Sequence, residues 1–347
     1  MALVDIKSMF EAELLEDFKK SGYPAYRASQ VYLWLVKGVK RFDEMRNLPK
    51  SLISELSEKY YVTGAEIVRK LVSKIDGTIK YLFRLNDGEY IEAVVMSYRH
   101  GYTICISTQV GCKMGCRFCA TGKGGFARNL TASEMISQIK EAELDSGIRI
   151  SNVVLMGMGE PLDNYENVVR FLRLVSSAEN LNIGMRHISL STCGIIDKIC
   201  KLAEEKFQLT LSVSLHAPDD LTRSKIMPIS KKYSLDDLLA ACRFYISKTN
   251  RRISFEYAMI AGVNDSDECA RLLAEKLRKM LCHVNLIPAN DVDFAPGSYK
   301  KSGMERIKKF VNILEKYGIN VTIRRTLGAD INASCGQLRR STKTVEV

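Results

Sequence analysis

The pattern of apolar and polar positions divides the chain into a helical N-terminal part and a longer part in which strands and helices alternate. Up to about residue 70, apolar side chains recur at helical spacing, and Pro24 and Pro49 interrupt the pattern. We therefore expect a helical accessory domain over residues 1–75. The recurring apolar positions are Leu14, Leu15, Phe18, Tyr26, Val31, Leu33, Leu35 and Val36.

Short apolar runs separated by turn residues follow this helical part. Thr78–Leu85 and Ile91–Met96 flank the sequence Asn-Asp-Gly at 86–88. An Asp-Gly pair between apolar runs is typical of a β-hairpin. A third run, Tyr102–Ser107, leads into a group of cysteines. We expect a short β extension over residues 76–103.

From residue 104 to residue 325, strand-like and helix-like runs alternate, with helices expected at Ala132–Leu144 and Tyr165–Val175. Alternation of this kind predicts parallel strands joined by crossover helices. The predicted fold class is α/β, a partial (β/α)6 barrel with its chemistry at the carboxyl ends of the strands, followed by a tail over residues 326–347. The expected strands are Asn152–Met156, His187–Ser191, Leu209–Ser214, Ile253–Met259, His283–Ile287 and Asn320–Ile323.

Composition places the chain among soluble globular proteins. The 347 residues are 46% hydrophobic and 26% charged, and no run approaches the ~20 apolar residues of a membrane span. The first five residues lack the basic and apolar regions of an export signal, so we expect a cytoplasmic protein without a membrane partner. The net charge of +11 favours a polyanionic partner, although a solvated basic surface would explain it equally well.

The cysteines change this picture, because three of the ten stand close together as Cys112, Cys116 and Cys119. In the cytosol, where stable disulfides are rare, such a group indicates a metal site or catalysis. Three thiolates on one loop can each bind one iron of a 4Fe–4S cluster and leave the fourth iron open to a substrate. A zinc site or buried thiols are the alternatives, but zinc sites favour paired Cys-x2-Cys motifs.

The spacing Cys-x3-Cys-x2-Cys after a strand resembles the radical S-adenosylmethionine (SAM) superfamily. Gly157-Met-Gly-Glu-Pro161 follows the next strand and resembles the segment with which members hold the amino group of SAM. The resemblance implies a 4Fe–4S cluster with three cysteine ligands and SAM as cofactors. It also implies SAM contacts by Gly159, Glu160, Ser191, Ser214, Leu215, His216 and Asn290.

Matches over nearly the whole chain narrow the resemblance to the RlmN-type adenosine C2 RNA methyltransferases. They include Gln109–Gly122, Gly157–Asn164, Ser191–Gly194, Ser214–His216 and Val284–Pro288. The most specific is Gly328–Gln337, which contains Cys335 and is shared with the related Cfr-type C8 enzymes. Asn285–Pro288, Thr249–Arg252 and Gly159–Leu162 look more like the C2 enzymes.

The resemblance implies three catalytic residues and two SAM molecules per turnover. Because C2 of adenine is not nucleophilic, methyl transfer needs a radical route, and Cys335 would carry the methyl group as S-methylcysteine. Glu92, which interrupts an apolar strand, would accept the C2 proton. Cys105 would resolve the covalent RNA adduct by forming a transient disulfide with Cys335. Without the resemblance, an outward-facing Glu92 and a structural Cys105 would be the ordinary interpretations.

The implied substrates are an adenosine in the peptidyl-transferase loop of 23S rRNA and adenosine 37 of tRNA. Candidate RNA contacts are the basic side chains of residues 1–75 and Arg324, Arg325, Arg339 and Arg340. We also expect a flavodoxin-like electron donor and a monomeric chain. The alternatives are a Cfr-type C8 methyltransferase, a radical SAM enzyme without an RNA substrate, and a non-catalytic RNA-binding module with structural zinc.

Overall fold

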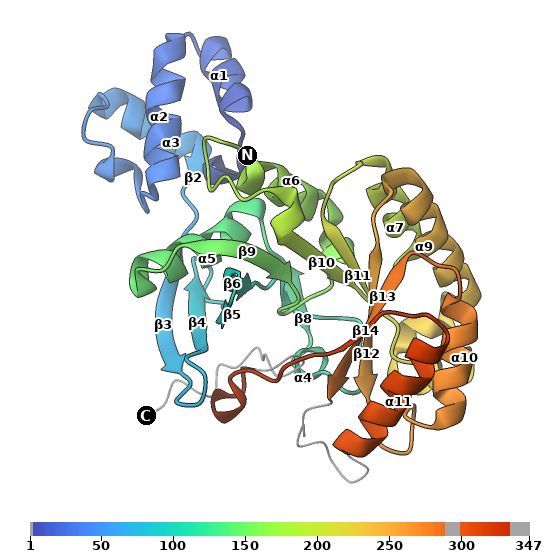
Figure 1. The fold of residues 1–347 in the computed structure, drawn as a ribbon. Helices are drawn as coiled ribbons and strands as arrows, with labels where there is room; N and C mark the ends of the chain where they lie inside the picture. The colour runs from blue at the N-terminus through green and yellow to red at the C-terminus, as the bar shows by residue number, and fades with distance from the viewer. Residues whose placement is uncertain (1–2, 289–298, 334–347) are drawn as a thin grey trace.

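A mixed sheet of ten strands organises the molecule (Figure 1), which we describe from a computed structural model over residues 3–288 and 299–333. The strand order is β14-β13-β12-β11-β10-β9-β6-β5-β4-β3, with β3 and β14 at the two edges. The strands are β3 (Ala65–Val72), β4 (Ile79–Leu85), β5 (Tyr90–Tyr98), β6 (Gly101–Cys105), β9 (Ile150–Leu155), β10 (Ile188–Thr192), β11 (Thr210–Ser214), β12 (Ile253–Met259), β13 (Cys282–Pro288) and β14 (Val321–Ile323).

Strands β6 and β9 to β14 run parallel, and the connections between them contain the main helices. The helices lie on the outer side of the curved sheet (Figure 1), which confirms the predicted α/β partial barrel. No helix in the described ranges is both long and apolar enough to cross a membrane. The helices are α5 (Ala132–Ser146), α6 (Tyr165–Ser176), α7 (Ile196–Glu204), α8 (Asp220–Ile226), α9 (Leu235–Thr249), α10 (Asp267–Leu277) and α11 (Met304–Lys316).

The strand register gives the two faces of the sheet different chemistry. Residues paired across neighbouring strands share a face, as do residues two apart along one strand. The face beneath the helices is apolar and fully buried, for example at Leu190, Leu211 and Phe255. The opposite, inner face has mainly polar and reactive side chains from β14 to β4. Its members include Thr322, Asn285, Glu256, Ser214, Ser191, Ser189, Val154, Cys105, Val94, Glu92 and Lys80.

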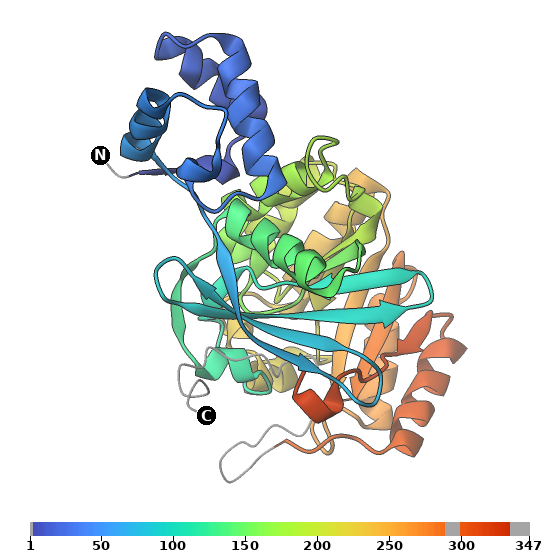
Figure 2. The ribbon, with the colours of Figure 1, turned by 90° about the vertical axis from the view of Figure 1, so that its left-hand side faces the viewer.

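The antiparallel strands β3 to β6 extend the barrel sheet rather than forming a separate layer (Figure 2). The expected hairpin is present as β4 and β5, joined at Asp87-Gly88. Our prediction of helices up to about residue 70 was wrong for residues 65–72, which form the edge strand β3. A bulge between Ile67 and Arg69 breaks the two-residue alternation that identifies a strand, and the exposed edge tolerates charged side chains.

The N-terminal residues form a small helical domain with its own apolar core around Leu14, Val31 and Leu52. Asp5 joins this domain to the barrel, because its carboxylate accepts hydrogen bonds from Thr63 and from Ser133 at the start of α5, both at 2.6 Å. The elements are β1 (Val4–Asp5), α1 (Glu11–Lys20), α2 (Ala25–Lys37), α3 (Lys50–Lys59) and β2 (Tyr60–Tyr61).

Candidate active site

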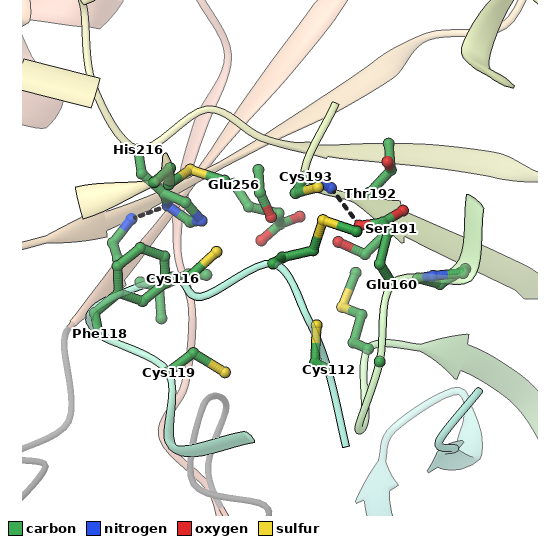
Figure 3. Close-up of a pocket in the computed structure, with 18 of the residues that line it drawn as sticks. Cys112, Cys116, Phe118, Cys119, Glu160, Ser191, Thr192, Cys193, His216 and Glu256 are labelled. Carbon is green, nitrogen blue, oxygen red and sulfur yellow. Dashed lines mark hydrogen bonds between the residues drawn. The ribbon is translucent and has the colours of Figure 1, made fainter. Parts of the chain in front are cut away.

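A pocket opens where the parallel strands end, at the carboxyl edge of the polar inner face. Ser191, Ser214 and Glu256 line it from three neighbouring strands, and the cysteine loop closes it from one side (Figure 3). In an α/β barrel this edge is where ligands bind, because every strand end contributes a loop. Further lining residues are Met156, Gly159, Glu160, Thr192, Cys193, His216, Met227, Ala258, Ile287, Tyr299 and Arg324.

The cysteine loop is held between two short antiparallel strands, β7 (Gln109–Gly111) and β8 (Phe126–Asn129). The backbone N–H of Cys112 donates to the carbonyl of Gly125 at 2.8 Å, which closes the base of the loop. Gly111 has a φ of 78°, and a Cβ there would overlap the Gly125 carbonyl oxygen. The short helix α4 (Ala120–Lys123) follows the third cysteine.

The thiols of Cys112, Cys116 and Cys119 surround a shared space at the mouth of the pocket (Figure 3). Burial raises the pKa of Cys112 to about 12 and also raises that of Cys116, and the neighbouring thiols and Glu160 add to both shifts. Iron binding would replace these protons. Among the described residues, no three His, Cys, Asp or Glu side chains are close enough to bind one metal ion. The three thiols that surround one space are the ligand set that a 4Fe–4S cluster with one open iron would use.

Glu160 lies next to this space, is buried, and connects two strand ends. Its Oε2 accepts the backbone N–H of Cys193 at 2.7 Å, and its Oε1 accepts that of Leu162 at 3.0 Å. Burial raises the pKa of Glu160, and the backbone donors oppose that rise. Gly159 has a φ of 105°, and a Cβ there would lie 2.6 Å from Cβ of Gln109. This glycine therefore allows the loop after β9 to approach β7.

His216 follows β11 in a left-handed conformation and is fixed by its neighbours. Its Nδ1 accepts the backbone N–H of Ala258 at 2.9 Å, and its ring packs edge-on against Phe118 of the cysteine loop at 4.7 Å. Burial lowers the pKa of His216 to about 3, and the positive charge of Arg223 adds to the shift. The imidazole is therefore neutral near pH 7 and joins the loop to β11 and β12.

Arg223 on α8 is fully buried behind the pocket and was not predicted from the sequence. Its guanidinium donates to the carbonyls of Cys193 at 2.7 Å and of Ser214 and Leu215 at 3.1 Å. It therefore holds the loops after β10 and β11 together. An arginine in an exposed sequence context gives no signal of such a role, since most arginines lie at the surface.

Glu256 is a second pocket residue that the sequence analysis missed. It is buried, and its Oε2 accepts a hydrogen bond from the Asn285 side chain at 2.8 Å. Nη1 of Arg324 lies 3.7 Å from the same oxygen. A carboxylate in the middle of the predicted strand Ile253–Met259 was the available signal, but the resemblance assigned a role to Glu92 and none to Glu256.

The predicted SAM contacts differ in where they lie relative to the pocket. Gly159, Glu160, Ser191, Ser214 and His216 all line the pocket. Leu215 lies between two lining residues, but its side chain is buried and its N–H donates to the Glu256 carbonyl at 3.0 Å. Asn290 lies outside the described residues.

Glu92 and Cys105 lie farther along the polar inner face rather than in the pocket lining. Both are nearly buried, and Cys105 pairs with Val94, two residues after Glu92. Oε1 of Glu92 lies 2.9 Å from Nζ of Lys80. Cys335 lies outside the described residues, but the chain before it reaches this region, because Lys80 also donates to the carbonyl of Asn332 at 3.1 Å.

The barrel and its cysteine loop define a radical SAM protein, and comparisons with known proteins agree. Residues 106–273 match the family model of the radical SAM superfamily. A solved radical SAM methyltransferase from Sphaerobacter thermophilus superimposes with a TM-score of 0.89 at 45% identity, covering 97% of this chain and 100% of that one.

Further matches identify the family within this superfamily. Residues 4–62 match the N-terminal domain of ribosomal RNA large subunit methyltransferases. A probable dual-specificity RNA methyltransferase RlmN from Alkaliphilus oremlandii is 54% identical over 98% of both chains. A protein of the same name from Clostridium tetani is 54% identical over 94% of both. The chain belongs to the RlmN family of radical SAM methyltransferases and is an enzyme.

Proposed function

We propose that this enzyme methylates C2 of adenosine in RNA, in the peptidyl-transferase loop of 23S rRNA and at the position beside the tRNA anticodon. The observation that carries the proposal is the shared inner face, on which Glu92 and Cys105 lie in the same sheet as the cysteine-lined pocket. A carboxylate and a thiol on the same face of the sheet as a radical-generating centre are the groups that the C2 reaction requires. The RNA substrate follows the names of the relatives, and the net charge of +11 suits a polyanion.

The donor set fits the two cofactors that the family implies. Cys112, Cys116 and Cys119 would hold three irons of a 4Fe–4S cluster, which leaves the fourth open to SAM. Gly159, Glu160 and the serines at the strand ends would contact SAM. When bound, the cluster and two SAM molecules per turnover supply the methyl group, the radical that removes a hydrogen atom from it, and an acceptor for one electron.

The chain's own residues would complete the transfer. The Cys335 sulfur accepts the methyl group, and the methylene radical derived from it adds to C2 of adenine. Loss of one electron, and of the C2 proton to Glu92, leaves a thioether between Cys335 and the base. The Cys105 thiolate then attacks the Cys335 sulfur, so that an S–S bond forms and the C–S bond breaks. The released electron pair stays on the methylene carbon, which takes a proton to become the methyl group.

The remaining expectations complete the proposal. The disulfide between Cys105 and Cys335 must be reduced by a thiol reductant before the next turnover. A flavodoxin-like protein would supply the electron that starts each cycle. We propose that the enzyme acts as a monomer in the cytoplasm, where its RNA substrates occur.

Mass spectrometry of RNA from a host that overproduces the protein tests the site of methylation. We expect C2-methyladenosine in 23S rRNA and in tRNA. Methylation at C8 would instead favour a Cfr-type reaction, and unmodified RNA would favour a radical SAM reaction on another substrate.

The variant Cys105→Ala tests the covalent route. Without the resolving thiol, the enzyme should accumulate a covalent RNA–protein adduct, visible as a band of reduced mobility on denaturing gels. Cys200→Ala on α7 is a matched control that should turn over normally. Normal turnover by Cys105→Ala itself would contradict the proposed mechanism.

A further inference from the structure

A lysine links the proposed base to the tail that precedes the proposed methyl carrier. Nζ of Lys80 lies 2.9 Å from Oε1 of Glu92 and donates a hydrogen bond of 3.1 Å to the backbone carbonyl of Asn332. The side chains of Lys80 and Glu92 are only 10% and 12% exposed, so little water competes for either contact. Lys80 has no part in the chemical steps proposed above.

The position of Lys80 in the sheet places it on the reacting face. Lys80 pairs with Val94 across β4 and β5, and Val94 pairs with Cys105 across β5 and β6. Side chains paired in this way point to the same side of the sheet. Lys80, Glu92 and Cys105 therefore form one group on the inner face.

The tail is attached to the sheet at several points, and the Lys80 contact is the last of these hydrogen bonds in chain order among the residues that the structure describes. The turn between β3 and β4 lies beside the helical turn Ala329–Ile331 (Figures 1 and 2). There, Asp330 accepts hydrogen bonds from the hydroxyl of Ser73 at 2.7 Å and the backbone N–H of Lys74 at 2.9 Å. Asp76 accepts the N–H of Gly328 at 2.9 Å.

The distance along the chain connects this attachment to the reaction. Cys335 follows Asn332 by three residues, and three residues of chain span at most roughly 11 Å. Holding the Asn332 carbonyl therefore limits the region that the Cys335 sulfur can reach. The same ammonium also orients the Glu92 carboxylate. One side chain therefore holds both the proposed base and Asn332, after which comes the stretch with Cys335, called the carrier segment below.

We propose that Lys80 is a positioning residue for methyl transfer, which keeps the carrier segment in register with Glu92 on the inner face. The proposal rests on the proposed function, because it takes Cys335 as the methyl carrier and Glu92 as the base. If Lys80 served only to neutralise Glu92 within the fold, its loss would lower every activity of the enzyme in proportion to the amount of folded protein.

The ratio of two products separates positioning from stability. Each radical event releases one 5′-deoxyadenosine, and each completed transfer gives one methylated adenosine. Lys80→Met should raise the ratio of 5′-deoxyadenosine to methylated adenosine by about tenfold, the order expected for loss of one charge-assisted hydrogen bond. Lys80→Arg, which keeps the charge and donors, should return the ratio to within about threefold of the parent value.

Lys70 provides a matched control in the same sheet. Its Nζ lies 2.7 Å from Asp145, and its pairing with Tyr81, the residue after Lys80, directs it to the opposite face. Lys70→Met removes a lysine–carboxylate pair without touching the inner face, so the product ratio should stay at the parent value. An unchanged ratio in Lys80→Met, or an equal rise in Lys70→Met, would overturn the proposal.

Hydrogen exchange tests the attachment without any activity. In Lys80→Met, the amides of residues 327–333 should exchange about tenfold faster, while those of α9 keep their parent rates. If this variant does not fold, Lys80→Met with Glu92→Gln removes both charges of the pair and permits the same measurement. Unchanged exchange in the tail would contradict the attachment. A parent enzyme that makes no methylated adenosine would instead refute the proposed function.

Discussion

The carboxylate of Glu160 accepts the backbone N–H of Cys193 at 2.7 Å and so joins the loops that follow β9 and β10, beside Cys112 of the cysteine loop (Figure 3). Its second oxygen accepts the N–H of Leu162, so one buried side chain satisfies two backbone donors. The residue that the family resemblance assigns to SAM binding therefore also maintains the shape of the site before any ligand arrives.

Replacing Glu160 should weaken the fold even without cofactors. Glu160→Ala leaves two buried N–H groups without their acceptor, at a cost of about 1–3 kcal/mol for each. Chemical denaturation of the cluster-free protein would measure this loss of unfolding free energy. Glu166→Ala on α6 is the control, because its side chain is 77% exposed and should change the value by less than about 0.5 kcal/mol. Equal stabilities for the two variants would show that Glu160 has no structural role.

Gly159 should not tolerate a side chain. Gly159→Ala forces a left-handed backbone on alanine, which costs about 1–2 kcal/mol, and places its Cβ against Gln109. Gly38, which follows α2, has a similar φ of 95° but nothing within 4 Å of its Cβ position, so Gly38→Ala reports the backbone strain alone. We expect Gly159→Ala to lose about 1–3 kcal/mol more unfolding free energy than Gly38→Ala, because of the added overlap. Equal losses would mean that Gln109 moves aside freely.

Much of the barrel could be predicted because each parallel strand is a short apolar run bounded by turn residues. The strand at Ile253–Met259 agrees with its prediction residue for residue, and β9, β10, β11 and β13 agree within two residues at each end. Strand β3 was missed because a bulge and an exposed edge remove the alternation on which such predictions depend. The pairing with β4 is what makes residues 65–72 a strand, and a local sequence pattern does not record which segments pair.

The site was predictable where local spacing determines the chemistry and not where long-range contacts do. Three cysteines on one loop identify themselves by their spacing. By contrast, Arg223 and Lys80 act through backbone carbonyls that lie far away in sequence or on other elements. A single sequence does not reveal which carbonyls a cation will meet. The strand register shows that Glu92 and Cys105 lie on one face of the sheet, whereas the sequence linked them only through the family resemblance.

His216 should make the cluster-free fold sensitive to acid. Burial lowers its pKa to about 3, whereas an unfolded histidine titrates near ~6.5. Between these values the unfolded chain binds more protons, so this contribution to stability is complete above ~6.5 and is lost as the pH falls towards 3. Unfolding free energy should therefore fall by up to ~1.4 kcal/mol per pH unit in this window.

Comparison with His216→Gln isolates this contribution. A glutamine can still accept the Ala258 N–H but does not titrate, so the variant should show a shallower loss of stability on acidification. Denaturant unfolding at several pH values between about 7 and 5 would measure both slopes. His100→Gln at the exposed surface is the control. Parallel slopes for the parent and His216→Gln would contradict the assignment.

Removing one cysteine of the loop should prevent cluster binding without unfolding the barrel. We expect Cys119→Ala, reconstituted anaerobically, to lose most of its iron and its broad visible absorbance, because two thiolates hold a cluster poorly. Cys269→Ala on α10, which is not among the residues that line the pocket, should keep the parent content of iron and sulfide. Iron retained in Cys119→Ala, or zinc found in place of iron in the parent protein, would refute the cluster assignment.

Glu92→Gln should stop the reaction after Cys335 has been methylated and before methylated adenosine is released. The amide keeps the size of the side chain and can still accept a hydrogen bond from Lys80, but it cannot take the C2 proton. Methylated adenosine should therefore fall by about 10²-fold or more, the usual range for loss of a general base. Methylation of Cys335 precedes this step, so in the absence of RNA the tail peptide of Glu92→Gln should still carry the methyl group in mass spectra. Glu89→Gln, in the turn before β5, is the neighbouring control and should turn over normally. If Glu92→Gln makes methylated adenosine at the parent rate, another group must accept the proton, and Lys80 would then orient a carboxylate that takes no part in the reaction.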